Sequence, residues 1–206
     1  SEDCYNAVFE NKGKSKTIEI ASIREEWYVF YSKALFETLK YHECIRVCDK
    51  ACQVLKELHY DNYIWFQRRI AQCYLKIDKI DESINIYIQI LTKKTDWFLL
   101  KEISECYYLR EELDTALTYG KKAASSFGPI NFKIELFELL GDILNKKGEY
   151  KLAWLHYTLV HLIREAENWK ENGDLNEKLK YLSNYADESL KLSKDDGSDL
   201  DSFLDV

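Results

Sequence analysis

The chain has 206 residues, of which 46% are apolar and 32% charged, and this globular composition excludes a disordered or collagen-like chain. One proline and seven glycines argue against a turn-rich β-sandwich and favour an all-helical protein. The formal net charge is −7, and the five Asp of residues 195–206 leave only −2 on the rest of the chain. This is not the basic balance of a protein that binds nucleic acid directly.

The sequence also bears on the cellular compartment. No apolar run is long enough to span a membrane, and residues 1–20 hold no apolar signal-peptide core. The six cysteines do not follow the spacing of a secreted disulfide framework. These features together predict a cytoplasmic protein, with the nucleus as the alternative.

The N-terminal leader, residues 1–21, is predicted to be either a small β-hairpin or a disordered segment. Hydrophobic spacing then predicts a helical domain over residues 22–194. Its helices are expected near 22–39, 42–58, 61–77, 80–94, 96–110, 113–126, 130–147, 150–170 and 174–193. The last of these has Lys and Glu between its leucines, which is typical of a capping helix. Residues 195–206 are predicted to form a flexible acidic tail.

Small residues recur in pairs that are twelve positions apart. The pairs are Ser32 with Cys44, Ala71 with Ser83, Ser104 with Ala116, and Gly141 with Ala153. Successive pairs are separated by 39, 33 and 37 residues, close to the roughly 34 residues of a helix–turn–helix repeat. Two antiparallel helices joined by a short turn must approach closely at one point, and a small residue on each helix permits that approach.

These columns resemble the tetratricopeptide repeat (TPR) family, as four degenerate repeats over about residues 22–165. The fourth repeat matches the family consensus best, with Leu140-Gly141, Leu144, Gly148, Tyr150, Ala153 and Tyr157. The resemblance implies an all-α fold, a right-handed α-solenoid of antiparallel helix pairs with a C-terminal capping helix. It also implies a non-catalytic protein–protein interaction module, because the fold of this family is a generic interaction platform.

In the resembled family the first helix of each repeat lines a concave groove, which is expected here to bind a peptide or a partner helix. Helical spacing assigns residues to that face. The predicted apolar anchors are Trp65, Phe98 and Tyr108, and the predicted polar contacts are Lys33, Arg68, Gln72 and Lys101. A segment with apolar and acidic side chains would fit this region. The fourth repeat would instead fit a basic segment, because it presents Glu135, Glu138, Asp142 and Asn145.

Candidate catalytic and metal-binding residues do not form a pattern typical of either function. Cys44, Cys48 and Cys52 form an i, i+4, i+8 row, but the first two occupy packing positions of the repeat. The histidines lack the spacing of a helical metal site, and no phosphate-binding glycine loop or nucleophile motif is present. We therefore predict no enzyme activity, no catalytic residues, no metal and no cofactor.

An alternative role is a structural or assembly domain of a larger protein or complex, including one that acts on nucleic acid. In that case the groove is not the main interface. Self-association through the groove or the acidic tail belongs to this alternative, since residues 200–205 alternate apolar and acidic side chains. Direct binding to nucleic acid or to a membrane is not expected.

Overall fold

The computed structural model describes residues 4–11, 14–170 and 172–185, so the predicted acidic tail lies outside the described residues. The chain divides into two compact units, residues 1–94 and 95–206. The first unit contains β1 (Cys4–Asn11), β2 (Lys14–Ala21), α1 (Ile23–Glu37), α2 (Tyr41–Val54), α3 (Asn62–Lys76) and α4 (Ile80–Leu91). The second contains α5 (Trp97–Leu109), α6 (Leu113–Ser125), the 3₁₀ turn η1 (Ile130–Lys133), α7 (Ile134–Lys146), α8 (Tyr150–Ala166), α9 (Gly173–Tyr181) and the 3₁₀ turn η2 (Ser183–Tyr185).

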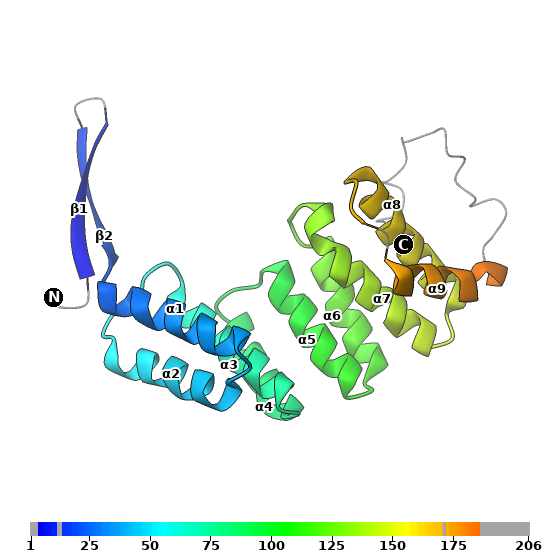
Figure 1. The fold of residues 1–206 in the computed structure, drawn as a ribbon, viewed down its shortest axis with the longest axis horizontal. Helices are drawn as coiled ribbons and strands as arrows, with labels where there is room; N and C mark the ends of the chain where they lie inside the picture. Colours follow the sequence, from blue (N-terminus) through cyan, green and yellow to red (C-terminus); the bar gives the residue numbers. More distant parts are fainter. Residues whose placement is uncertain (1–3, 12–13, 171, 186–206) are drawn as a thin grey trace. The chain divides into compact units, whose positions relative to one another are not determined.

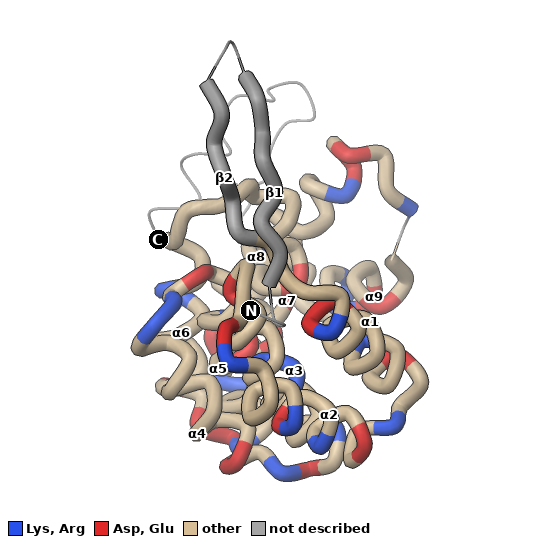
Figure 2. Tube along the Cα trace, turned by 90° about the vertical axis from the view of Figure 1, so that its left-hand side faces the viewer, with Lys and Arg blue, Asp and Glu red and all other residues tan. Residues whose placement is uncertain are grey.

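Within each unit the helices pack as antiparallel pairs, α1 with α2 and α3 with α4, then α5 with α6 and α7 with α8 (Figure 1). Successive pairs in a unit also pack on each other, through α2 with α3 and through α6 with α7. The predicted all-α class of helix pairs is therefore confirmed. Figure 2 shows basic and acidic positions interspersed along the helices whose residues it colours.

The described part of the leader is an antiparallel hairpin. β1 pairs with β2 so that Cys4 lies opposite Ala21 and Asn11 opposite Lys14. Ser22 follows directly and caps α1, because its hydroxyl accepts a hydrogen bond of 3.1 Å from the backbone N–H of Glu25. The sequence had left this segment open between a hairpin and a disordered leader.

The paired small residues lie where the two helices of each repeat touch. The thiol of Cys44 donates to the carbonyl of Ser32 at 3.2 Å. Two serine hydroxyls bridge the later pairs in the same way, Ser83 to the carbonyl of Ala71 at 2.9 Å and Ser104 to that of Ala116 at 2.7 Å. A short polar side chain can reach the backbone of the other helix only when the helix axes are close. These hydrogen bonds therefore show that the two helices approach closely at the paired small residues, as predicted.

The fourth repeat makes the same approach without a hydrogen-bonding side chain. A Cβ atom added to Gly141 would lie 2.5 Å from the ring of Tyr157 on α8. Ala153 and Tyr157 are fully buried beside it. The glycine is thus required by the aromatic ring that packs on its helix, and not by its backbone conformation.

Each first helix ends in the same left-handed turn. Leu39, Asp78, Glu111 and Gly148 all have positive φ, between 60° and 78°. The next residue donates its N–H back to the carbonyl five positions earlier, which gives Lys40 to Leu35, Lys79 to Tyr74, Glu112 to Tyr107 and Glu149 to Leu144. This is the Schellman motif, which satisfies the free carbonyls of a helix end and normally takes glycine at the left-handed position. Only the fourth repeat has glycine there.

Four predicted helices differ from the structure by four or more residues at one end, and those expected over 42–58 and 150–170 end early, at Val54 and Ala166. The helix expected over 130–147 begins as the 3₁₀ turn η1, and α7 starts only at Ile134. The capping helix expected over 174–193 ends at Tyr181, where the hydroxyl of Ser183 donates to the carbonyl of Lys180 at 2.8 Å. Such a local side-chain bond competes with continued helix. Residues 186–193 of the predicted helix lie outside the described residues.

We expect Leu39→Gly to raise the free energy of unfolding by about 0.5–1 kcal/mol. A left-handed conformation costs a non-glycine residue roughly 1–2 kcal/mol, and the greater freedom of glycine in the unfolded chain offsets only part of that. The Leu39 side chain is 70% exposed and is not part of the core, so its removal costs little packing energy. Urea denaturation measures the change. The reverse exchange, Gly148→Ala, should destabilise by a similar amount, and a destabilised Leu39→Gly would contradict the account.

Candidate functional site

In the first unit, the predicted contact residues are carried by α1 and α3. Trp65, Arg68 and Gln72 follow i, i+3, i+7 spacing and share one half-buried face of α3. The Arg68 guanidinium lies 5.5 Å from the centre of the Trp65 ring, and Lys94 Nζ lies 5.8 Å from it. Lys33 on α1 is exposed and ion-paired with Glu37 at 3.8 Å. The unit therefore has an aromatic ring, that of Trp65, with two cations within 6 Å of its centre.

A buried carboxylate holds α3 in position. Glu25 in the first turn of α1 is fully buried. It accepts hydrogen bonds from the backbone N–H of His59 at 2.7 Å and from the amide of Asn62 at 2.7 Å, and His59 Nδ1 lies 2.8 Å away. A buried charge is tolerated only when it is fully hydrogen-bonded. Glu25 thus anchors the α2–α3 loop and the start of α3, the helix that carries Trp65.

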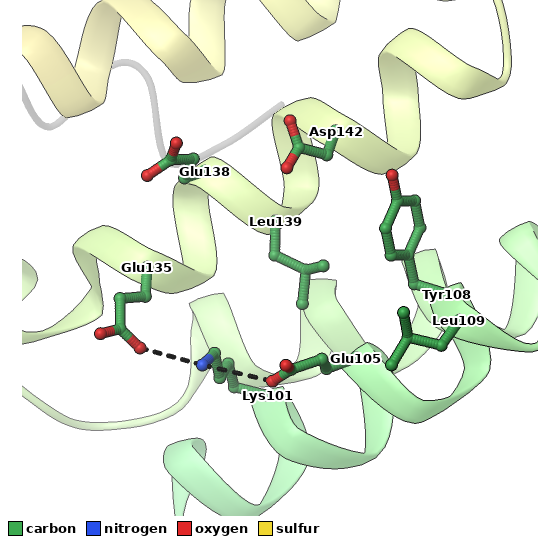
Figure 3. Close-up of a pocket in the computed structure, with 8 residues that line it drawn as sticks. All are labelled: Lys101, Glu105, Tyr108, Leu109, Glu135, Glu138, Leu139 and Asp142. Carbon is green, nitrogen blue, oxygen red and sulfur yellow. Dashed lines mark hydrogen bonds and ion pairs between the residues drawn. The ribbon is translucent and has the colours of Figure 1, made fainter. Parts of the chain in front are cut away.

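In the second unit, a cleft of about 260 Å³ opens between α5 and α7. Figure 3 shows side chains of both helices converging on it. The lining residues are Lys101, Glu105, Tyr108 and Leu109 from α5, with Glu135, Glu138, Leu139 and Asp142 from α7. Two predicted contact residues, Lys101 and Tyr108, are brought together here. The third, Phe98, is half-buried on α5 with its ring edge-on to Trp97 and does not line the cleft.

Lys101 is already engaged by carboxylates. Its Nζ lies 3.0 Å from Glu135 and 3.5 Å from Glu105 (Figure 3). Burial acts to lower the pKa of Lys101, but the charge of Glu105 and the hydrogen bond to Glu135 outweigh it and raise that pKa. The ammonium therefore stays charged at neutral pH. Four carboxylates line the cleft with Lys101, and Lys178 of α9 pairs with two of them, Glu138 and Asp142. The formal charge of these six side chains is therefore −2.

Sequence reasoning placed the acidic residues of this cleft on the inner face but did not include them among the contact residues. It did not identify Leu109 and Leu139 as part of the face. Leu109 is half exposed at the end of α5, and Leu139 is largely buried where α7 faces α5. An apolar residue beside a row of charged ones on a first helix is the signal that could have found them.

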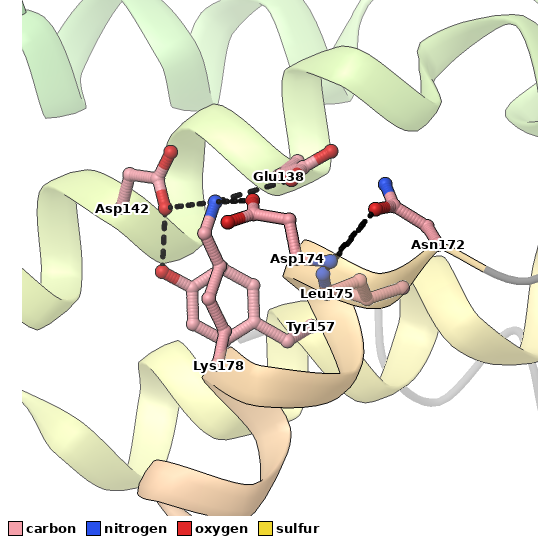
Figure 4. A network of polar contacts seen from close by, with 7 residues as sticks. All are labelled: Glu138, Asp142, Tyr157, Asn172, Asp174, Leu175 and Lys178. Carbon is pink, nitrogen blue, oxygen red and sulfur yellow. Dashed lines mark hydrogen bonds and ion pairs between the residues drawn. The ribbon is translucent and has the colours of Figure 1, made fainter.

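The acidic end of α7 is partly neutralised by the chain itself. Figure 4 shows Lys178 of α9 pointing at three carboxylates. Its Nζ lies 2.9 Å from Asp142, 3.1 Å from Glu138 and 3.2 Å from Asp174. The hydroxyl of Tyr157 also donates to Asp142 at 2.6 Å. The basic group that the sequence expected from a partner at the fourth repeat is thus supplied, at Glu138 and Asp142, by α9.

The electrostatics of this network favour the charged pair. Burial acts to lower the pKa of Lys178, but the hydrogen bonds and charges of Asp142, Glu138 and Asp174 outweigh it and raise that pKa well above its usual value. Burial and the bond to Asp142 raise the pKa of the Tyr157 hydroxyl, which stays protonated as a donor. Lys178 therefore fastens α9 to α7 through charge as well as packing.

Four cysteines in the described part of the chain belong to the core, namely Cys44, Cys48, Cys73 and Cys106. Cys44, Cys48 and Cys73 are fully buried in the first unit and are free thiols. A hydrogen bond with Cys48 acts to lower the pKa of Cys44, but the one with Cys73 and burial outweigh it and raise the pKa to about 12. Among the residues that the structure describes, no group of three or more His, Cys, Asp or Glu is arranged to hold a metal ion. No described helix is long and apolar enough to cross a membrane.

We expect Lys178→Met to weaken the docking of α9 by about 1–3 kcal/mol, because it leaves partly buried carboxylates without a cation. The raised pKa fixes the sign of the pH dependence. The stabilisation is complete below the unfolded-state pKa of about 10.4 and is lost as the pH rises above it through the folded-state pKa. Hydrogen exchange of the α9 amides at neutral pH measures the loss of docking, and circular dichroism during an alkaline titration follows the pH dependence. The exposed neighbour Lys180→Met is the control, and equal protection in the two variants would contradict the assignment.

Comparison with known proteins places the fold. No family model and no curated protein sequence matches the chain. Among solved structures, PilF of Pseudomonas aeruginosa superposes with a TM-score of 0.65 at 11% identity, covering 77% of this chain and 67% of PilF. The TPR-like repeats of a Podosopora anserina putative kinesin light chain superpose with a TM-score of 0.61 at 10% identity, covering 79% of this chain and 86% of that one. MamA MSR-1 superposes with a TM-score of 0.58 at 13% identity, covering 79% of this chain and 87% of MamA. At these identities the likeness concerns the fold alone. The chain therefore has the TPR-like fold, an all-α solenoid of antiparallel helix pairs.

Proposed function

We propose that this chain is a non-catalytic protein-interaction module that binds an extended peptide segment on the first helices of its repeats. The observation that carries the proposal is the cleft between α5 and α7, where charged and apolar side chains of two successive repeats converge. Its volume of about 260 Å³ lies below the roughly 300–1,000 Å³ of small-molecule and cofactor sites. It suits one or two side chains of a peptide that continues along the helices.

The lining of the cleft selects the chemistry of the peptide in the second unit. Glu105 and Glu135 already hold the ammonium of Lys101, so an acidic side chain would have to compete with them. A Lys or Arg side chain would instead be attracted by the net negative charge of the lining. Its aliphatic stem would lie against Tyr108 and Leu139. We therefore propose a basic residue next to an apolar one as the preferred occupant.

The first unit favours a different side chain. The ring of Trp65 with Arg68 beside it is the type of aromatic and arginine pair that dominates binding energies at interfaces. With Gln72 on the same face, this surface supports contact with an apolar or acidic side chain, and Lys33 adds a positive charge on α1. The proposal thus assigns opposite charge preferences to the two units.

Selection from a displayed peptide library with the intact chain tests the cleft. We expect peptides enriched in Lys or Arg beside an apolar residue. In fluorescence anisotropy, Glu135→Lys should weaken the selected peptide at least tenfold, because the Glu135 side chain is 79% exposed at the rim and its reversal repels a cation. Lys101→Met should leave affinity unchanged or raise it. Glu57→Lys, an exposed reversal of the same size in the first unit, is the control.

The opposite result would be equally clear. If the selected peptides are acidic and Lys101→Met weakens them, the cleft binds anions through Lys101, as the sequence predicted. If no peptide is enriched, or if Glu135→Lys and Glu57→Lys behave alike, the cleft is not the binding surface. Arg68→Ala then reports separately on the first unit, where it should weaken only acidic peptides.

One observation favours the alternative of an assembly domain. Helix α1 exposes large apolar side chains on the face opposite its buried side, namely Ile23, Trp27 and Phe30. An exposed apolar stripe of this kind marks a surface that another protein covers.

A further inference from the structure

We propose that α1 is a self-association surface, on which two copies of this chain pair their first helices antiparallel. The proposal concerns a different surface from the peptide cleft and does not depend on it. Helix α1 has one buried face and one apolar exposed face. Its buried residues, Glu25, Tyr28, Ser32 and Leu35, pack toward the first unit. The opposite face carries Ile23, Trp27 and Phe30, which are 71%, 53% and 69% exposed, and the exposed Ala34.

The spacing of this second face is that of a coiled-coil seam. Ile23, Trp27, Phe30 and Ala34 are separated by four, three and four residues, which places them in one line along a helix that packs against another helix. α1 is the first helix of the described repeats, and its outer face is apolar where a solvent-exposed helix face is normally polar. Trp27 is held in place by stacking on Tyr31, with ring centres 4.8 Å apart. Ala34 leaves room for a second helix to approach closely.

The charges beside the seam identify a second copy as the occupant. Glu26 and Lys33 are both exposed, and the same heptad spacing places both on one flank of the seam. When two identical helices pair antiparallel about a twofold axis, each flank meets the same flank of the other copy. With Phe30 at the centre, Glu26 lies about 6 Å to one side and Lys33 about 4.5 Å to the other, at 1.5 Å per residue. Glu26 of each copy therefore lies opposite Lys33 of the other. Lys33 exchanges its exposed 3.8 Å pair with Glu37 of its own helix for this one, and the new pair forms twice.

The size of the patch fits a reversible dimer. Fully buried aromatic side chains contribute about 150–250 Å² each, so the exposed parts of Ile23, Trp27 and Phe30 offer on the order of 400 Å² of apolar surface per copy. The flanking charged side chains extend this toward the roughly 800 Å² per partner of a standard interface. A large aromatic centre with charged edges is the usual anatomy of a specific interface.

Sedimentation velocity of the intact 206-residue chain between 1 and 100 µM tests the proposal. We expect a reversible dimer with twice the monomer mass. Phe30→Glu should abolish it, because the twofold axis brings the two carboxylates together at the centre. Lys50→Glu, an exposed reversal on α2, should leave it intact. Circular dichroism of each variant confirms that the helices are retained.

A charge exchange distinguishes a second copy from any other apolar occupant. Glu26→Lys alone and Lys33→Glu alone each place like charges opposite one another and should weaken dimerisation at least tenfold. The double variant Glu26→Lys/Lys33→Glu restores opposite charges and should return to within about threefold of the wild type. A wild-type chain that stays monomeric at 100 µM, a dimer that Phe30→Glu leaves intact, or a double variant without rescue would each overturn the proposal. Peptide binding in the α5–α7 cleft should be the same in Phe30→Glu and wild type, so the two proposals fail separately.

Discussion

The close approach of two helices at a pair of small residues is the constraint on which every repeat depends. Where Ser83 reaches the carbonyl of Ala71, or Ser104 that of Ala116, the helix axes are near enough for a hydroxyl to bridge them. Large side chains fit only around this point, and for that reason Phe66 and Tyr157 are fully buried in their units. A protein interior is packed as densely as an organic crystal, so a larger residue at the contact would push the helices apart.

The helix ends make that approach possible. A left-handed residue followed by a backbone bond to the carbonyl five positions earlier reverses the chain within a few residues. The second helix can then start beside the first without leaving carbonyls unsatisfied. Three of the four repeats tolerate a non-glycine residue in this conformation, and one of them, Glu111, gains an ion pair of 2.8 Å with Lys146 of the next repeat. At Glu111 the local strain is thus partly offset by a contact with the neighbouring repeat.

Charge pairing between repeats decides which groups are left for a ligand. Lys101 is taken by Glu105 and Glu135, and Lys178 by the carboxylates at the end of α7. Each ammonium thereby holds two helices together, and the net charge of the side chains that line the α5–α7 cleft remains negative. A lysine on a first helix is therefore not a ligand contact by virtue of its position, because the next repeat can neutralise it.

The sequence by itself determined the repeat register and the pairing of the helices. These depend on residue size and helical periodicity within a stretch joined by one short turn, such as the twelve-position spacing of Ser104 and Ala116. It also placed Lys101 and Tyr108 on one face. The tertiary structure alone decided the partner of each charge, since Glu135 and Lys101 come from different repeats and meet only after the helices have packed. The tertiary structure also decided where α9 ends, and it placed Lys178 of α9 against the carboxylates of α7. The physical reason is that ion pairs and clefts depend on distances of a few ångströms between separate helices, which no periodicity along one helix specifies.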